Sequence, residues 1–324
     1  MTTFLITGGA GYIGAHVVRA LLAAGERPVV YDDLSTGLRA RVPEGVPLVE
    51  GSTLDRVLLD QTIARHEVGA VIHLAAKKQV AESISRPLRY YRENVHGLQI
   101  LLEAVRGARI ETFVFSSSAS VYGTPADDGP VTEDTVCAPI SPYGETKLIG
   151  EWLVRNAGRA HGISTACLRY FNVAGAAAPE LADTSVSNLI PMVFERLDAG
   201  LPPLIFGDDY PTPDGTCVRD YIHVEDLAQA HVAAARALSE QPFAGDLTLN
   251  IGRGEGVSVR EMAEQIGVLT HHEALIPQVG PRRVGDPARV VARTDAAAKH
   301  LGWSARRGVR DMITSAWTGW RFIR

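Results

Sequence analysis

The chain has 324 residues, of which 46% are hydrophobic and 21% charged, a globular composition that excludes an extensively disordered protein. Its formal net charge of −5 argues against nucleic acids and membrane surfaces as partners, because proteins that bind either one normally carry an excess of Lys and Arg. No run of 18 apolar residues occurs, so we expect no membrane span and a cytoplasmic protein.

The first half alternates short apolar runs with longer amphipathic segments, which is the pattern of parallel strands joined by helices. Near-continuous apolar strands are typical of a sheet that helices cover on both faces. Strands are expected over Phe4–Thr7, Pro28–Asp32, Val46–Glu50, Ala70–Ala75, Thr112–Ser116 and Ser164–Tyr170. The fold class is therefore predicted to be α/β, with a Rossmann-type doubly wound parallel sheet.

A glycine-rich run, GGAGYIG from Gly8, follows the first strand and leads into the helical pattern of Tyr12–Ala24. The missing side chains allow a tight turn and let the backbone approach a pyrophosphate. The helix N-terminus offers N–H groups and its positive dipole end to the same anion. We predict a dinucleotide site on Gly8, Gly11 and Gly14, and the alternative is a glycine turn without a ligand.

Asp32 ends the second strand 18 residues after Gly14, close to the spacing expected of an acid that binds the adenosine ribose. A carboxylate there repels a 2′-phosphate, which favours NAD over NADP. A solvated loop carboxylate is the alternative, and Arg39 or Arg41 would permit NADP binding.

Tyr143 and Lys147 form a YxxxK pair where a helix is expected to start. Their spacing places both on one helix face, so the ammonium is expected to lower the pKa of the phenol toward neutrality and prepare it to take a hydroxyl proton. With four lysines and nine tyrosines in the chain, this spacing rarely arises by chance. The alternative is that Tyr143 and Lys147 are an ordinary pair of side chains on an exposed helix face. A serine run from Ser116 follows the fifth strand, and one hydroxyl is expected to reach the reacting oxygen.

The regular alternation ends after Asn172, where the stretch 174–188 has the composition of a linker. We predict a cofactor-binding domain over residues 1–172 and a smaller mixed α/β substrate-binding domain over residues 173–324, parts of which pack back on the first. The second half is expected to contain helices near Pro191–Ala199 and Val224–Ser239, strands near Leu204–Gly207 and Leu247–Gly252, and helices that begin near Val257 and Gly308.

These features, in this order, resemble the extended short-chain dehydrogenase/reductase family, and within it the UDP-glucose 4-epimerases, over nearly the whole chain. The resemblance is carried by TGGAGYIG from Thr7, SSSASVYG from Ser116, SPYGETK from Ser141, LRYFN from Leu168, IFGDDYPTPDGTCVRDYIHVEDLA from Ile205 and RRVGDPA from Arg282. The long stretch from Ile205 is the most diagnostic of them.

The resemblance implies a role for each site residue. Tyr143 would be the acid/base, Lys147 would tune it and hold the nicotinamide ribose, and Ser118 would hydrogen-bond the sugar O4. These three residues would bind NAD together with Gly8, Gly11, Tyr12, Ile13, Gly14, Asp32, Ser52, Thr53, Leu74, Ala75, Lys78 and Phe171. The UDP-sugar would be bound by Ser118, Tyr143, Asn172, Asn188, Leu189, Leu204, Phe206, Arg219, Arg283, Asp286 and Val290, with the arginines at its diphosphate.

The implied reaction is the NAD-dependent interconversion of UDP-glucose and UDP-galactose through a transient 4-keto sugar, with no net redox change. Relatives that dehydrate nucleotide sugars carry an acidic residue directly after the catalytic Ser or Thr, whereas this chain has Ala119 and Ser120, which favours 4-epimerisation. The alternatives are 4-epimerisation of a UDP-N-acetylhexosamine, UDP-uronic acid or UDP-pentose, and a non-catalytic NAD-sensing protein. The family's usual assembly implies a homodimer, built on helices such as the one expected over Leu88–Val105.

Several positions depart from the family pattern. Ser52 stands where many relatives have an adenine-binding Asp, Glu93 replaces a frequent Asn, and the loop Gly175–Ser187 is shorter. Val290 falls at the position that gates the sugar pocket in this family, and its small side chain is expected to admit an N-acetylated sugar. No metal is expected, because the run from His271 to Glu273 lacks a spaced third ligand.

Overall fold

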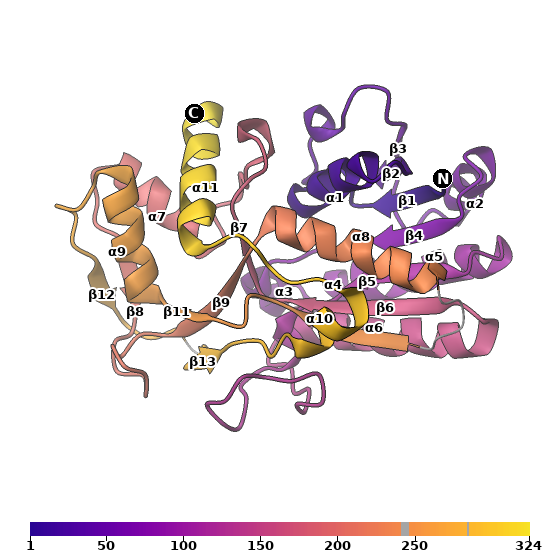
Figure 1. Cartoon of the computed structure of the whole chain (residues 1–324). Helices are drawn as coiled ribbons and strands as arrows, with labels where there is room; N and C mark the ends of the chain where they lie inside the picture. The colour runs from indigo at the N-terminus through magenta and orange to yellow at the C-terminus, as the bar shows by residue number, and fades with distance from the viewer. Residues whose placement is uncertain (241–245, 284) are drawn as a thin grey trace.

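A seven-stranded parallel sheet forms the centre of the protein, with the strand order β10-β6-β5-β4-β1-β2-β3 (Figure 1). The structure is a computed structural model that describes residues 1–240, 246–283 and 285–324, so Val284 of the run RRVGDPA lies outside the described residues. The strands are β1 (Thr3–Thr7), β2 (Arg27–Asp32), β3 (Leu48–Glu50), β4 (Ala70–His73), β5 (Thr112–Ser116), β6 (Ser164–Tyr170) and β10 (Asp246–Ile251). The predicted doubly wound α/β fold is confirmed.

Helices cover both faces of this sheet because each strand is apolar on both sides. One face carries α1 (Tyr12–Ala23), α8 (Val224–Glu240) and α10 (Asp295–Leu301), and the other carries α2 (Arg56–Arg65), α5 (Gly97–Gly107) and α6 (Pro142–His161). Short segments connect them: α3 (Val80–Ser85), α4 (Pro87–Tyr90) and a π-helical segment, Tyr91–His96. The two resulting apolar clusters are separated by the sheet itself.

A second lobe lies beyond the carboxyl edge of the sheet, where α7, α9 and α11 gather beside β8 and β12 (Figure 1). Its elements are β7 (Asn172–Ala174), α7 (Leu189–Asp198), β8 (Leu204–Phe206), β9 (Val218–His223), β11 (Gly256–Ser258), α9 (Val259–Thr270), β12 (Gln278–Gly280), β13 (Arg289–Val290) and α11 (Val309–Ile323). Phe194, Met262 and Met312 are fully buried in its core. This lobe therefore has an apolar core of its own.

The division into two domains at residue 172 stays a prediction. After this residue the chain returns to the first lobe. Strand β10 pairs with β6 at the edge of the central sheet, and α8 packs against α1. Both elements come from the second half of the sequence. Their apolar residues predict that they are buried, but not which lobe they pack in.

The structure refines two local predictions. The helix expected to begin near Val257 starts at Val259, because Gly256–Ser258 first pairs antiparallel with β9. Ser258 then caps the helix, since its Oγ accepts a hydrogen bond from the Glu261 amide at 2.9 Å. The stretch 174–188, expected to be a loop or linker, is mainly loop and contains the end of β7 and a 3-10 turn at Pro179–Leu181.

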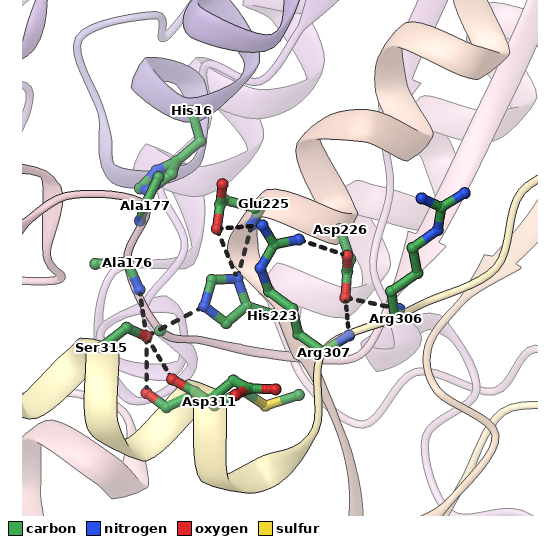
Figure 2. A network of polar contacts seen from close by, with 12 residues as sticks. His16, Ala176, Ala177, His223, Glu225, Asp226, Arg306, Arg307, Asp311 and Ser315 are labelled. Carbon is green, nitrogen blue, oxygen red and sulfur yellow. Dashed lines mark hydrogen bonds and ion pairs between the residues drawn. The ribbon is translucent and has the colours of Figure 1, made fainter.

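The segment Gly175–Ala177 joins the lobes and is hydrogen-bonded to α1 and to α11. Figure 2 shows His16 and Ser315 beside its residues Ala177 and Ala176. From α1, the Tyr12 hydroxyl donates to the Gly175 carbonyl at 2.6 Å and His16 Nε2 accepts from the Ala177 amide at 3.0 Å. From α11, Ser315 Oγ accepts from the Ala176 amide at 3.2 Å. The cofactor-side helix α1 and the C-terminal helix α11 thus hold the same three residues.

The hydrogen bonds assign the neutral tautomers of the two histidines near this segment. Nδ1 of His223 accepts from the Glu225 amide at 3.2 Å, so Nε2 carries the proton and donates to Ser315 at 3.1 Å. His16 uses Nε2 as its acceptor, so its Nδ1 donates to the Tyr12 carbonyl at 2.8 Å. Burial lowers the pKa of each ring to about 4, which agrees with these neutral forms.

We predict that stability falls as the pH drops from 6.5 toward 4. Burial lowers the pKa of His16, His223 and His231 to about 4, so the unfolded chain binds more protons in this range. Each histidine should remove about 1.4 kcal/mol of unfolding free energy per pH unit while it titrates. Urea unfolding at pH 7.5, 6 and 5 measures this.

Asp220 works against this trend, because burial raises its pKa to about 6 and the folded protein then binds the extra proton. The decisive comparison is therefore between variants. His16→Gln should make the fall with pH shallower, whereas the exposed His161→Gln should leave it unchanged. An equal slope in both variants and the parent would contradict the assignment.

Candidate functional site

The glycine loop brings three pieces of backbone too close together for side chains. Gly8 has a φ of +74°, and a Cβ there would stand 2.7 Å from the Ala75 amide nitrogen. A Cβ on Gly14 would overlap the Gly8 carbonyl oxygen. Helix α1 consequently begins, with Gly11 as its N-cap, directly at the end of β1 and next to the end of β4. These contacts fit a loop through which backbone approaches a pyrophosphate.

Asp32 lies buried at the end of β2, beside this loop. Its Oδ2 accepts from the Ala10 amide at 3.0 Å and its Oδ1 from the Leu34 amide at 2.9 Å. Burial raises the pKa of the carboxyl, and these two hydrogen bonds act in the opposite direction. Of the two candidates for NADP binding, Arg39 is in an exposed ion pair with Glu50 at 2.8 Å, and Arg41 is buried and donates to the Ala182 carbonyl at 2.6 Å. The buried Asp32 carboxylate fits NAD, because it can accept from ribose hydroxyls and would repel a 2′-phosphate.

The other expected cofactor residues follow the neighbouring strands. Leu74 and Ala75 continue from β4, and the Leu74 amide donates to the Thr7 carbonyl at 3.0 Å. Ser52 follows β3, accepts from the Tyr31 hydroxyl through its carbonyl at 2.9 Å, and lines a shallow groove with Asp33 and Glu93. Thr53 is buried beneath Gly97, where a Cβ would meet its hydroxyl at 2.5 Å. Ile13 lies in the first turn of α1.

The expected catalytic residues meet at the carboxyl end of β5. Ser141 caps α6 by accepting from the Gly144 amide at 3.2 Å, which places Tyr143 and Lys147 on the first two turns. Lys147 Nζ donates to the Ser116 carbonyl at 2.7 Å and lies 6.0 Å from the centre of the Tyr143 ring. Ser118 caps the following 3-10 turn and contacts the Tyr143 phenol. The structure brings all three expected residues together.

The electrostatics of the pair differ from the prediction. Burial lowers the pKa of Lys147 to about 8, with Glu151 opposing the shift. Burial raises the pKa of Tyr143, and only Ser118 counteracts it, so the predicted lowering of this pKa toward neutrality is wrong. The reason is that the Lys147 ammonium is directed at the Ser116 carbonyl rather than at the phenol oxygen. Tyr143 is therefore a neutral phenol near pH 7.

A buried ion pair behind these residues was not predicted from the sequence. Arg169 on β6 donates to Glu151 through Nε at 2.8 Å and Nη2 at 2.7 Å, and the Glu151 side chain is fully buried. Glu151 also accepts from the Ser117 hydroxyl at 2.6 Å. Lys147 thus donates to the Ser116 carbonyl while Glu151 accepts from the Ser117 hydroxyl, so these two neighbouring residues are fixed from both sides. One signal was present, because Glu151 follows Lys147 by one helical turn.

A cavity of about 940 Å³ separates the sheet edge from the second lobe. Arg219 and Asp286 face each other there at 3.7 Å, and the Arg283 guanidinium stacks 3.8 Å above the Phe206 ring. The lining includes many expected residues, namely Tyr12, Lys78, Asn172, Asn188, Leu189, Leu204, Phe206, Arg219, Arg283 and Asp286. It also includes residues that the sequence did not single out, namely Gln79, Ile190, Cys217, Tyr221 and Trp320. All of these except Trp320 lie within two positions of an expected residue, and that nearness was the available signal.

Three of the residues expected to bind the UDP-sugar, Ser118, Tyr143 and Val290, do not line this cavity, and neither does the expected cofactor residue Phe171. Ser118 and Tyr143 lie under the sheet edge and are more than nine-tenths buried. Phe171 and Val290 are buried in a small apolar cluster that also contains Tyr122. The site is therefore divided between a buried catalytic corner and an open cavity.

Metal-ligating groups are not found in the part of the chain that the structure describes, where no cluster of three or more His, Cys, Asp or Glu residues could hold an ion. His272 instead bonds Thr270 at 3.0 Å and packs edge-on against Trp317. Among the same residues, none of the helices combines the length and apolar character that a membrane span needs.

The comparisons with known proteins agree with one another. Residues 4–252 match the model of the NAD dependent epimerase/dehydratase family. The chain is 45% identical to the UDP-glucose 4-epimerase of Azospirillum brasilense over 320 residues, covering 98% of this chain and 91% of that relative. It resembles the Stenotrophomonas maltophila UDP-glucose-4-epimerase solved with bound NAD and formylated UDP-arabinopyranose, with a TM-score of 0.94, 37% identity and coverage of 100% and 99%. It also resembles the Brucella ovis UDP-glucose 4-epimerase in complex with NAD, with a TM-score of 0.92, 41% identity and coverage of 98% and 97%.

We predict that Glu151→Ala destabilises the fold by about 3 to 5 kcal/mol, because it leaves the Arg169 guanidinium buried without its partner. The double variant Glu151→Leu/Arg169→Met should recover most of this loss, since it buries no charge. Glu103→Ala, which breaks an exposed pair with Arg56, serves as the control and should cost less than about 1 kcal/mol. Urea unfolding measures all three. A Glu151→Ala value equal to that of the control would show that the buried pair is not structural.

Proposed function

The chain belongs to the NAD dependent epimerase/dehydratase family, and from this membership we propose that it interconverts UDP-glucose and UDP-galactose. It is an isomerase, a NAD-dependent UDP-sugar 4-epimerase, as the resemblance predicted. The choice of this sugar pair is the proposal. The observation that carries it is the near full-length similarity to UDP-glucose 4-epimerases, and the burial of Tyr143 and Lys147 at the carboxyl end of β5 supports the chemistry.

The residues divide the work by position. The N–H groups at the start of α1 bind the pyrophosphate, and Asp32 accepts from the adenosine ribose hydroxyls. When bound, NAD would supply the hydride acceptor and donor for sugar C4 on the two faces of the ring. Tyr143 removes the O4 proton and later returns it, while Ser118 hydrogen-bonds O4. The residues around Ser52, Leu74 and Lys78 complete the cofactor cleft.

The proton transfer depends on the charges near the Tyr143 phenol. Burial raises the pKa of Tyr143, and Ser118 opposes the effect of burial. A positively charged nicotinamide near the phenol would lower that pKa. We therefore expect Tyr143 to act as a base toward O4 when NAD is bound.

The second lobe supplies the proposed nucleotide contacts. Arg219 and Arg283 lie in the cavity as charge-assisted donors for a diphosphate, and Phe206 offers an aromatic face to the uracil. The polar lining residues Asn172 and Asn188 face the same space and are expected to orient the sugar and its phosphates. The remaining proposed contacts come from Leu189, Leu204, Asp286 and Val290.

The assembly of the chain is a further part of the proposal. The chain is expected to be a homodimer, which the exposed side chains of Leu88 on α4 and Trp152 on α6 support. Helix α5 gives less support than its sequence suggested, because Leu98, Leu101 and Leu102 are buried within the same subunit. A cytoplasmic location and the absence of nucleic-acid partners stay predictions.

We predict that Tyr143→Phe lowers kcat for UDP-galactose by at least about 100-fold, the usual effect of losing a general acid/base, while UDP binding is retained. Product separation after incubation with UDP-galactose measures the rate, and calorimetry measures binding. Tyr91→Phe is the matched control, because it loses only a hydroxyl bond to Glu145 outside the site. Epimerisation by Tyr143→Phe at the parent rate would refute the assigned base. Failure of the parent to epimerise any UDP-hexose would revive the non-catalytic NAD-sensing reading.

We also predict that the protein accepts UDP-N-acetylhexosamines beside the plain hexoses, because Val290 offers little bulk where the family gates the sugar pocket. Val290→Tyr should suppress turnover of the N-acetylated pair and spare the plain pair. A change of pocket size alone discriminates by about 1 to 3 kcal/mol, or about 10- to 200-fold in kcat/KM. The ratio of kcat/KM for the two pairs decides the matter, and an unchanged ratio in Val290→Tyr would remove Val290 from the gate.

A further inference from the structure

The Lys77 side chain joins two loops at the carboxyl edge of the central sheet. Its Nζ donates to Ser35 Oγ at 2.7 Å and lies 3.6 Å from Asp33 Oδ2. Ser35 passes the interaction on, because its hydroxyl donates to Asp33 Oδ1 at 2.6 Å. Although Lys77 carries a charge, its side chain is only 15% exposed. The three residues form one connected polar group, which we call the Lys77 bridge.

The backbone of Lys77 is held by hydrogen bonds, as its ammonium group is. The Asn94 side chain binds both backbone groups of Lys77, accepting from its amide at 2.8 Å and donating to its carbonyl at 3.0 Å. The same amide group donates to Thr146 Oγ1 on α6 at 3.0 Å, and Asn94 is buried. Because Thr146 lies between the two catalytic residues in sequence, the bridge is anchored to the helix that carries them.

The sheet order shows what the bridge spans. Strands β4, β1 and β2 are consecutive neighbours, and the glycine loop leaves the central one, β1. Lys77 follows β4, whereas Asp33 and Ser35 follow β2, so a contact between them crosses the carboxyl edge at β1. That edge is where a dinucleotide lies in a doubly wound sheet.

We propose that the Lys77 bridge closes over the adenosine side of the cofactor cleft and retains NAD between turnovers. The proposal rests on NAD binding by this chain and extends it to residues that the sequence did not assign to the cofactor. An epimerase regenerates its cofactor in place, so a contact that slows NAD release costs no turnover. The bridge can still open, because Asp33 is 38% exposed and water can replace its bond to Lys77.

The charges favour a bridge over a direct bond from Lys77 to the NAD phosphates. Burial alone would raise the pKa of Asp33, but hydrogen bonds from Ser35 and the charge of Lys77 bring it below its ordinary value. Asp33 is thus an ionised partner whose charge compensates that of Lys77. The Ser35 hydroxyl uses its one donor on Asp33 and accepts from Lys77, so it joins the two charged groups.

The test is the rate at which holoenzyme exchanges its bound NAD for isotope-labelled NAD. Lys77→Met keeps the apolar stem and removes the charge, and it should speed exchange by about 5- to 10-fold, the effect of losing one partly buried ion pair. Lys299→Met on α10 is the matched control, an exposed lysine that should leave the exchange rate unchanged. An unchanged rate in Lys77→Met would overturn the proposal.

A second pair of variants separates a bridge from a direct cofactor contact. The double variant Asp33→Asn/Ser35→Ala should speed exchange by the same factor as Lys77→Met, and adding Lys77→Met to it should have no further effect. If Lys77→Met speeds exchange equally in both backgrounds, Lys77 binds NAD itself and the bridge is refuted. If Lys77→Met does not fold, the Asp33→Asn/Ser35→Ala variant, which changes two exposed residues, decides alone: an NAD exchange rate equal to that of the parent would overturn the proposal. A parent protein that holds no NAD would instead refute the cofactor assignment.

Discussion

The close approach of backbone at the glycine loop fixes the position of α1, and much of the site depends on that helix. Gly8 and Gly14 leave no room for a Cβ, so α1 begins against the ends of β1 and β4. Its first turn then presents N–H groups to a pyrophosphate, and Tyr12 and His16 reach from the same helix to the segment Gly175–Ala177. One steric constraint therefore places both the cofactor cleft and the connection to the second lobe.

Burial gives the catalytic corner its chemistry. It lowers the pKa of Lys147 to about 8 and raises that of Tyr143. The Glu151–Arg169 pair supports this arrangement, because Glu151 accepts from the Ser117 hydroxyl while Lys147 donates to the Ser116 carbonyl. The protonation of both side chains is therefore sensitive to any further charge placed beside them.

The two halves of the site have different physical characters. The cofactor side is built on strand ends and helix starts, where backbone groups and buried side chains such as Asp32 are held rigidly. The substrate side is an open cavity whose arginines have partners that a ligand can replace, as in the stack of Arg283 on Phe206. This difference fits the proposed retention of NAD, since only the substrate enters and leaves at every turnover.

The sequence by itself determined the doubly wound sheet, the glycine loop, the acid at the end of β2 and the YxxxK helix, because each is a local pattern of periodicity, turn residues or spacing. Only the tertiary structure decided that β10 joins the central sheet, that Arg169 pairs with Glu151, and that Lys77 reaches Ser35. These contacts join residues far apart in the chain, and their partners are selected by packing. The same reason explains the error over Tyr143: spacing set the lysine on the correct face, but its burial and the Ser116 carbonyl set the pKa.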